Sequence, residues 1–303
     1  MRRSRIAAWV VGLAVTATVL TLGCGGGGEE SGLQLNAVAF GDGLFITVGE
    51  TGDAYANPGT GWTPFSTGVA SLEDVAYAPA EGLFVAVGDG GAIVTSTDGV
   101  AWTQQGSPTP LNLYGVAAGF DLVLAVGDGG TILASLDGIN WAQRSSGTEA
   151  TLYGVEFGDG LIVAVGAGGT VVVSSDLGVT WQATFAGLTN DLFATAYGAS
   201  GWVAVGQDGI ILQGPTPVDW EVVADDILPN LNDVVFTQGL FMVVGDDGNI
   251  LTSPDGLNYG SSVANTGQFL YGAAYGNGNF FVVGSSGRAL TSIDGAIFQN
   301  GKI

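Results

Sequence analysis

One pattern of residues recurs seven times along the chain. At residues 87–102 it reads Val-Gly-Asp-Gly-Gly-Ala-Ile-Val-Thr-Ser-Thr-Asp-Gly-Val-Ala-Trp, which suggests a strand, a glycine turn, a second strand, an aspartate turn and a Trp that opens another strand. A fixed period of about 40 residues with several short strands per unit is typical of a β-propeller. The sequence therefore predicts an all-β fold, a seven-bladed β-propeller of four-stranded antiparallel blades over residues 33–303. The first glycine of the copies recurs every 39 or 40 residues, at Gly49, Gly88, Gly127, Gly166, Gly206, Gly245 and Gly284.

Each repeat contains four predicted strands of different character. The second is the most apolar, as in Leu-Phe-Val-Ala-Val at 83–87, and such continuous runs indicate burial on both faces. We expect the small residues Ala86 and Ala125 near the central axis. The fourth strand is more polar and is predicted to be the outer edge. Whether the ring closes by packing alone or by pairing of residues 33–34 with the last blade stays open. The first strands are predicted to begin at Leu35, Leu72, Leu113, Leu152, Leu192, Leu231 and Leu270.

The first 32 residues are predicted to be a leader and a tether. Three arginines and an apolar run at 6–22 precede Gly23-Cys24, as in an export signal. The segment 20–24, Leu-Thr-Leu-Gly-Cys, resembles the lipobox of bacterial lipoproteins, although Thr21 departs from the usual Leu, Val or Ile. The resemblance implies a signal peptide at 1–23, a lipidated Cys24 and a Gly-rich tether over 24–32. An ordinary cleaved signal or a retained anchor are the alternatives. The residue after Cys24 is Gly25 rather than Asp. In a cell with two membranes, this resembles lipoproteins sorted to the outer membrane or the cell surface.

Composition excludes several function classes. The chain has 28 acidic and six basic residues, and three of the basic residues lie in the leader. Phosphate backbones would repel such a chain, so nucleic acid is not an expected partner. Histidine is absent and the single cysteine is the lipidation candidate, which removes His-based triads, His-ligated metals and thiol chemistry.

The turn before each Trp carries an Asp-box motif in five of the repeats. Residues 174–181, Ser-Ser-Asp-Leu-Gly-Val-Thr-Trp, match the full pattern, and four other repeats have a form one residue shorter. A carboxylate accepting turn amides, a glycine with positive φ and a packed aromatic ring make this a structural motif. The structural aspartates are Asp98, Asp137, Asp176, Asp255 and Asp294.

Asp boxes on a sevenfold repeat resemble the sialidase-like BNR-repeat propellers. The Val-Gly-x-x-Gly plus Ser-x-Asp-Gly-x-x-Trp pattern is more similar to the photosystem II stability/assembly factor family and its bacterial relatives. That resemblance implies a membrane-tethered, chaperone-like scaffold that holds a partner protein. In phototrophs the role is associated with a basic patch, which this chain lacks. A sialidase would need an arginine cluster, and only Arg144 and Arg288 remain beyond the leader.

Candidate binding residues cluster at one end of the predicted ring. The turns entering the first strands and those between second and third strands share this end, which we call the top face. Aromatic and acidic residues there suit a neutral sugar, a basic peptide or a cation. The alternative is that the aromatics only fill the channel mouth and the aspartates only form turns. The candidates are Asn36, Glu73, Asp74, Tyr114, Tyr153, Phe193, Asn232, Asp233 and Tyr271.

The sequence thus favours a non-catalytic, membrane-tethered scaffold that binds a protein partner in the cell envelope, as a monomer. A carbohydrate-binding surface module is the first alternative. A glycosidase using Glu73, Asp74 and Asp233 as paired carboxylates is the second. No catalytic residue, no metal site and no cofactor are predicted. Structural calcium among the top-face aspartates is left open, although their spacing fits neither an EF-hand nor a nonapeptide calcium loop.

Overall fold

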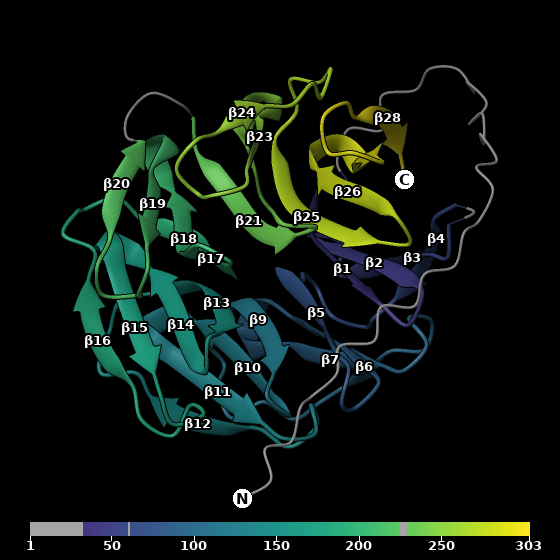
Figure 1. Cartoon of the computed structure of the whole chain (residues 1–303). Helices are drawn as coiled ribbons and strands as arrows, with labels where there is room; N and C mark the ends of the chain where they lie inside the picture. The colour runs from purple at the N-terminus through teal and green to yellow at the C-terminus, as the bar shows by residue number, and fades with distance from the viewer. Residues whose placement is uncertain (1–32, 60, 225–228) are drawn as a thin grey trace, which may run out of the picture.

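A computed structural model describes residues 33–59, 61–224 and 229–303. Within this part of the chain, seven four-stranded antiparallel sheets are arranged around a central axis (Figure 1). The predicted seven-bladed β-propeller is therefore confirmed. The predicted signal peptide, Cys24 and the tether lie outside the described residues, so these remain predictions.

The strands of the first four blades follow the chain from the axis outward. Blade 1 comprises β1 (Leu35–Gly41), β2 (Leu44–Gly49), β3 (Asp53–Asn57) and β4 (Thr63–Ser66). Blade 2 comprises β5 (Asp74–Ala78), β6 (Leu83–Val87), β7 (Ile93–Ser96) and β8 (Thr103–Gln104). Blade 3 comprises β9 (Leu113–Gly119), β10 (Leu122–Gly127), β11 (Thr131–Ser135) and β12 (Ala142–Ser145). Blade 4 comprises β13 (Leu152–Gly158), β14 (Leu161–Gly166), β15 (Thr170–Ser174) and β16 (Gln182–Phe185).

The remaining three blades repeat this order. Blade 5 comprises β17 (Leu192–Gly198), β18 (Gly201–Gly206), β19 (Ile211–Gly214) and β20 (Glu221–Ala224). Blade 6 comprises β21 (Leu231–Thr237), β22 (Leu240–Gly245), β23 (Ile250–Ser253) and β24 (Gly260–Ser261). Blade 7 comprises β25 (Leu270–Gly276), β26 (Asn279–Gly284), β27 (Arg288–Ser292) and β28 (Gln299–Lys302). Short 3-10 turns link the second and third strands of blades 2 to 7: η1 (Asp89–Gly91), η2 (Asp128–Gly130), η3 (Ala167–Gly169), η4 (Gln207–Gly209), η5 (Asp246–Gly248) and η6 (Ser285–Gly287).

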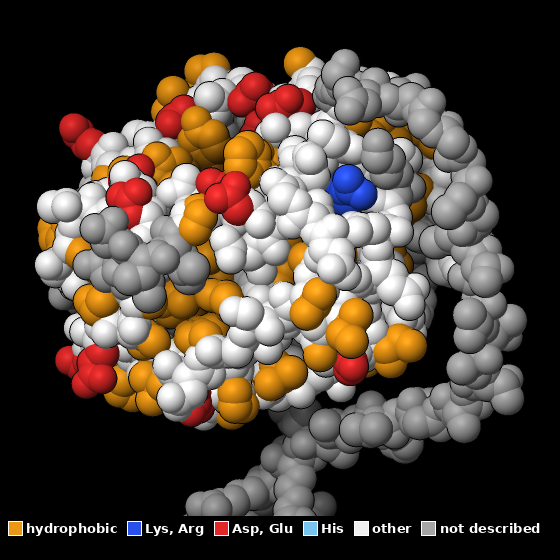
Figure 2. All heavy atoms as spheres, turned by 90° about the horizontal axis from the view of Figure 1, so that it is seen from above, with side chains coloured by type: hydrophobic (Ala, Val, Ile, Leu, Met, Phe, Trp, Pro, Cys, Tyr) orange, Lys and Arg blue, Asp and Glu red, His pale blue; other side chains and the backbone are white. Residues whose placement is uncertain are grey.

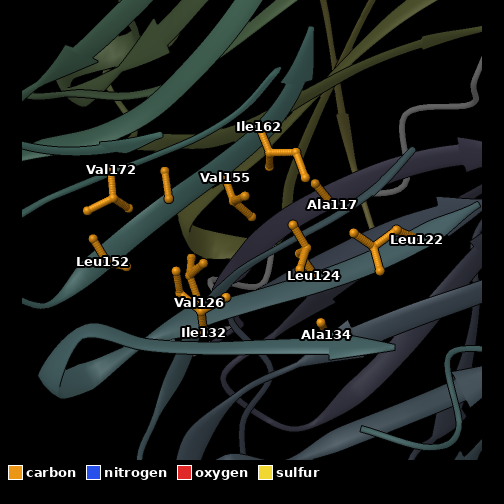
Figure 3. Packing of buried hydrophobic residues seen from close by; sticks show 11 residues of the cluster. Ala117, Leu122, Leu124, Val126, Ile132, Ala134, Leu152, Val155, Ile162 and Val172 are labelled. Atoms are coloured by element: carbon orange, nitrogen blue, oxygen red, sulfur yellow. The ribbon is translucent and has the colours of Figure 1, made fainter. Parts of the chain in front are cut away.

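Packing between second strands and the neighbouring blades forms the core. Every residue of β6 and β10 is buried, as the continuous apolar runs predicted. Leu124, Val126 and Ile132 of blade 3 pack against Leu152 and Val155 of blade 4 (Figure 3). Buried branched side chains from two sheets exclude water between them, and each fully buried side chain stabilises the fold by about 1.5–3 kcal/mol.

Two local predictions were wrong. Ala86 and Ala125 are buried between blades in the second strands, whereas the first strands line the axis. The period identifies a repeating unit but does not say which of its strands is innermost. The first strand of blade 2 begins at Asp74 rather than Leu72, because its ladder to β6 starts with the Asp74–Val87 pair and lacks the leucine–glycine pair that opens the other first strands.

The ring closes by packing of blade 7 on blade 1. Each sheet is built from contiguous strands, so no strand is exchanged across the junction. The Phe45 ring lies 4.1 Å from the Phe281 ring, centroid to centroid, within an apolar cluster shared by the two blades. A single backbone bond, from Gly287 N to Leu33 O at 2.7 Å, connects the start of the described chain to η6. The open question is thus answered mainly in favour of packing.

The surface of the molecule carries scattered acidic side chains. Figure 2, viewed at right angles to Figure 1, shows acidic residues spread among apolar ones over that side of the propeller. In the described part of the chain, no helix is long and apolar enough to span a bilayer.

Candidate functional site

A cavity of about 720 Å³ lies on the central axis and is lined mainly by the first strands of the blades. All nine top-face candidates line it: Asn36, Glu73, Asp74, Tyr114, Tyr153, Phe193, Asn232, Asp233 and Tyr271. The structure thus brings the whole predicted set together in one concave site. We refer to it as the central cavity.

A β-bulge positions the side chains around the mouth of this cavity. In blade 4, Leu152 pairs with Gly166 and Gly154 pairs with Val165, so Tyr153 has no partner in the ladder. The same shift follows the first-strand leucine in blades 1, 3, 5, 6 and 7. A bulge residue leaves the strand alternation and its side chain is re-aimed. Together with Glu73 at the equivalent position of blade 2, these residues form what we call the bulge ring: Asn36, Glu73, Tyr114, Tyr153, Phe193, Asn232 and Tyr271.

One side of the bulge ring is a continuous aromatic arc. The Tyr114 and Tyr153 ring centroids are 5.6 Å apart at 57°, and those of Tyr153 and Phe193 are 5.7 Å apart at 74°. These spacings and tilts are favourable for aromatic pairs, so the three rings support one another across blades 3, 4 and 5. All three are half-buried and keep part of their surface open to the cavity.

The other side of the bulge ring is a network of amides and carboxylates. The Asn36 Nδ2 group donates to Leu72 O at 2.9 Å and to Glu73 Oε2 at 3.2 Å. The Asn232 Nδ2 group donates to Asp246 Oδ1 and to Leu270 O, both at 2.9 Å. Each amide therefore bridges its own blade to the next one.

Three carboxyl groups lie deeper in the cavity. Asp74 Oδ2 accepts a hydrogen bond from Val116 N at 2.8 Å, and Asp233 Oδ2 accepts one from Ala273 N at 2.9 Å. Each of these aspartates thereby joins its first strand to that of the following blade. Glu156 Oε1 accepts from Phe157 N at 2.7 Å. We call Asp74, Glu156 and Asp233 the channel carboxylates.

Burial and mutual repulsion favour the neutral form of the channel carboxylates. Burial raises the pKa of Asp74 to about 7, and the charges of Asp233 and Glu156 raise it further against two backbone hydrogen bonds. Burial, assisted by the charge of Asp233, raises the pKa of Glu156 to about 7. Burial raises the pKa of Asp233 to about 6. A positive charge entering the cavity would favour their ionised forms.

The mouth of the cavity is also electronegative. Burial raises the pKa of Glu73, and the charges of Asp89 and Glu50 raise it further. Burial likewise raises the pKa values of the ring tyrosines, with additional contributions from aspartates of the nearby turns.

The sequence analysis missed Glu156. Its register position is occupied by small or apolar residues in the other blades: Ala39, Ala76, Ala117, Ala196, Val235 and Ala274. A single carboxylate in an otherwise apolar column was the available signal. Phe269, whose ring centroid lies 6.5 Å from that of Tyr271, also lines the cavity but was absent from the predicted set.

The Asp boxes lie at the opposite end of the blades and form closed turns. Asp98 Oδ1 accepts hydrogen bonds from Val100 N and Ala101 N at 2.9 Å and from Ser96 Oγ at 3.0 Å, which hold the pKa of Asp98 below its usual value. Trp102 Nε1 donates to the Gly99 carbonyl at 3.2 Å. Similar carboxylate bonds are formed by Asp137, Asp176, Asp255 and Asp294.

Metal binding receives no geometric support in the described residues. Within 33–59, 61–224 and 229–303, no three Asp, Glu, His or Cys side chains are close enough to share a metal ion. Calcium at the top face therefore stays an untested alternative.

Comparison with known proteins identifies similar folds. No protein-family model and no curated protein matches the chain. A structure of YCF48 bound to a D1 peptide matches with a TM-score of 0.69 and 16% identity, covering 87% of this chain and 93% of that one. YCF48 from Cyanidioschyzon merolae matches with a TM-score of 0.65 and 17% identity, covering 85% and 94% respectively.

This chain is similar to YCF48 in fold. The propeller fold that the sequence resemblance implied is therefore confirmed. At 16–17% identity this likeness shows the fold alone.

Proposed function

We propose that this protein is a non-catalytic scaffold, tethered to a membrane of the cell envelope through Cys24, that binds a partner protein at its top face. The observation that carries the proposal is the bulge ring. All seven blades direct a half-buried side chain to the mouth of one cavity, and half-exposed aromatic groups beside polar ones are typical of protein-binding surfaces.

The similarity to YCF48 supports protein binding by this fold. One of the matching structures is that of YCF48 bound to a D1 peptide. The fold does not determine which partner this chain binds, because a scaffold's specificity depends on its surface side chains rather than on its blades. We therefore infer protein binding from the fold, and we infer the kind of partner from the side chains that line the cavity.

The residues of the site favour binding over catalysis. The chain has no histidine, and among the described residues no arginine lines the central cavity. Asp74 and Asp233 accept backbone amides of the following blades, which is a structural use of two of the three carboxyl groups considered for a glycosidase.

The start of the described chain is compatible with a tether. The Leu33 carbonyl accepts a hydrogen bond from Gly287 at the end of η6, which places this end of the chain at the rim of the top face. A lipid on Cys24 would hold the propeller within a few tens of ångströms of the membrane, since nine extended residues span at most about 30 Å.

Affinity capture tests the proposal. The full-length chain in detergent, used as bait for envelope extract, should retain a partner protein, and exchange of Tyr114, Tyr153 and Tyr271 for Ala should abolish retention. The matched control replaces Leu136 and Ile293 with Ala, because these are 75% and 78% exposed in Asp-box turns at the opposite end. Retention that survives the tyrosine exchange but is lost in the control would overturn the proposed site.

A carbohydrate is the second candidate ligand for the same surface. The aromatic arc beside carboxylate and amide groups is an arrangement that also binds sugars. Binding of a neutral glycan that depends on Tyr153, with no protein retained from the extract, would favour this alternative.

A further inference from the structure

The central cavity is lined by acidic groups that a cation would ionise. Among the residues that the structure describes, no basic side chain lines the cavity. The carboxyl groups that line it are those of Glu73, Asp74, Glu156, Asp233 and Asp246. Low-dielectric walls concentrate the field of such groups, which raises the local concentration of cations. The cavity is thus complementary in charge to a cationic group.

The deepest carboxylate keeps acceptor capacity for a ligand. Within the described residues, Glu156 accepts one hydrogen bond, from Phe157 N to Oε1. An ionised carboxylate offers about four acceptor sites. Its remaining sites are therefore available to a donor that enters from the mouth.

The aromatic arc provides a second and independent recognition element. Tyr114, Tyr153 and Phe193 form tilted pairs at 5.6 and 5.7 Å, with partly exposed rings beside the mouth. Aromatic faces attract ammonium and guanidinium groups, and they pack well against aliphatic stems. A long side chain with a charged end matches both elements.

The dimensions favour an organic cation over a metal ion. The cavity volume of about 720 Å³ lies within the range of ordinary ligand sites. The described acidic groups are not close enough for three of them to share a metal ion. Several carboxylates spread over such a volume suit a cation that carries several hydrogen-bond donors.

Resting on the proposed function, we propose that the central cavity receives a lysine or arginine side chain of the partner protein. The cationic group lies among Asp74, Glu156 and Asp233, and its aliphatic stem lies against the aromatic arc. The top face is thereby a reader of basic segments, and its specificity comes from a charged group inserted on the axis.

Binding should strengthen as the pH rises. The channel carboxylates face one another, and Glu73 and Asp246 lie above them at the mouth. Burial raises the pKa values of Asp74 and Glu156 to about 7 and that of Asp233 to about 6, so all three are mostly protonated at pH 5.5. Because a cation favours the ionised forms, affinity should be at least threefold higher at pH 8 than at pH 5.5.

Calorimetry with defined peptides tests this proposal. The probes are end-blocked nine-residue peptides of Gly and Ser with one central Lys, Arg or Nε-acetyllysine, and the protein is the full-length chain. We expect saturable binding of the Lys and Arg peptides and at least tenfold weaker binding of the acetyllysine peptide. The combined exchange Glu156→Gln and Asp233→Asn should weaken binding at least tenfold, whereas Glu221→Gln on the exposed outer strand β20 should leave it unchanged.

Several outcomes would overturn the inference. These are equal affinity for the acetyllysine peptide, no binding of either basic peptide, or saturation of the site by calcium or magnesium ions alone. If the double variant does not fold, Glu156→Gln alone is used, because Glu156 makes no bond to a neighbouring blade within the described residues. If the protein binds no basic peptide but still captures a partner in a tyrosine-dependent way, this inference is refuted and the proposed function stands. If the protein captures no partner, the proposed function is refuted.

Discussion

At the scale of single residues, the site depends on where the first strands leave their ladder. Tyr153 points to the cavity mouth because the ladder passes from Leu152 directly to Gly154. The leucine before each bulge-ring residue is fully buried in all seven blades. This burial fixes where the bulge-ring residue lies, whereas the type of its side chain differs between blades. Function can therefore change at this position with little effect on the fold.

Glu156→Gln should stabilise the protein at high pH only. The pKa of Glu156 rises from 4.5 to about 7 on folding, so the folded state holds this proton longer than the unfolded state. Its contribution to stability is consequently greatest below pH 4.5 and is lost as the pH rises through 7. Removal of the ionisable group should raise the free energy of unfolding by about 3 kcal/mol at pH 8 and by little at pH 4.5.

Urea denaturation of both proteins at pH 4.5, 6 and 8 measures this effect. Glu221→Gln, an exposed exchange of the same kind, should change the free energy of unfolding little at any of these pH values. A pH-independent difference between Glu156→Gln and the unchanged protein would show that Glu156 ionises normally in the folded state.

Sequence reasoning located the residues whose position follows from the period. The repeat placed the bulge ring, Asp74 and Asp233 at one end of the molecule, and the structure brings them together. It missed the bulge itself, because a bulge depends on hydrogen bonding between strands and leaves no mark in one strand's composition. Simple alternation places Glu156 on the same strand face as Gly154, which is at the register position of Asp74 and Asp233. Sequence reasoning nevertheless missed Glu156, because the other blades have only small or apolar residues at the Glu156 position.

At the scale of the elements, neighbouring blades meet through a glycine at the end of a first strand. In blade 4, a Cβ atom added to Gly158 would lie 2.3 Å from Tyr197 Cγ of blade 5. The Tyr197 ring is itself packed on Trp202, with centroids 5.1 Å apart. Movement of the Tyr197 ring away from Gly158 would therefore disturb its packing on Trp202.

Gly158→Ala should destabilise the protein more than Gly160→Ala. The first exchange introduces a clash in the core, with an expected loss of about 3 kcal/mol. Gly160 has φ of +75° but nothing within 4 Å of an added Cβ, so that exchange introduces only backbone strain, about 1 kcal/mol. Equal losses in urea denaturation would mean that the two blades are not in close contact at Gly158.

At the scale of the whole molecule, the junction of blades 7 and 1 is built like the other interfaces. Phe45 of β2 is buried against blade 7, and Phe84 at the equivalent position of β6 is buried against blade 1. Both side chains are at most 1% exposed, and each packs on an aromatic ring of its own blade. A ring closed by packing needs this junction to be as strong as the rest.

Phe45→Ala and Phe84→Ala should therefore have similar effects. Each leaves a cavity in one interface, and we expect a loss of about 3–5 kcal/mol in both variants, equal within about 1 kcal/mol. Denaturation curves followed by tryptophan fluorescence and by protease resistance measure the loss. A much larger loss for Phe45→Ala, with cleavage starting in blade 1 or 7, would identify the junction as a weak point of the ring.

The most direct test of the central claim is site-specific photo-crosslinking in intact cells. A photoreactive phenylalanine analogue at Tyr153 of the bulge ring should form a covalent adduct with one partner protein, and mass spectrometry of the adduct should locate a lysine or arginine near the crosslinked segment. The same analogue at Gln143, exposed on the outer strand β12, should form no such adduct. An adduct from Gln143 but none from Tyr153 would contradict the account, because the partner would then bind the rim of the propeller and not its axis.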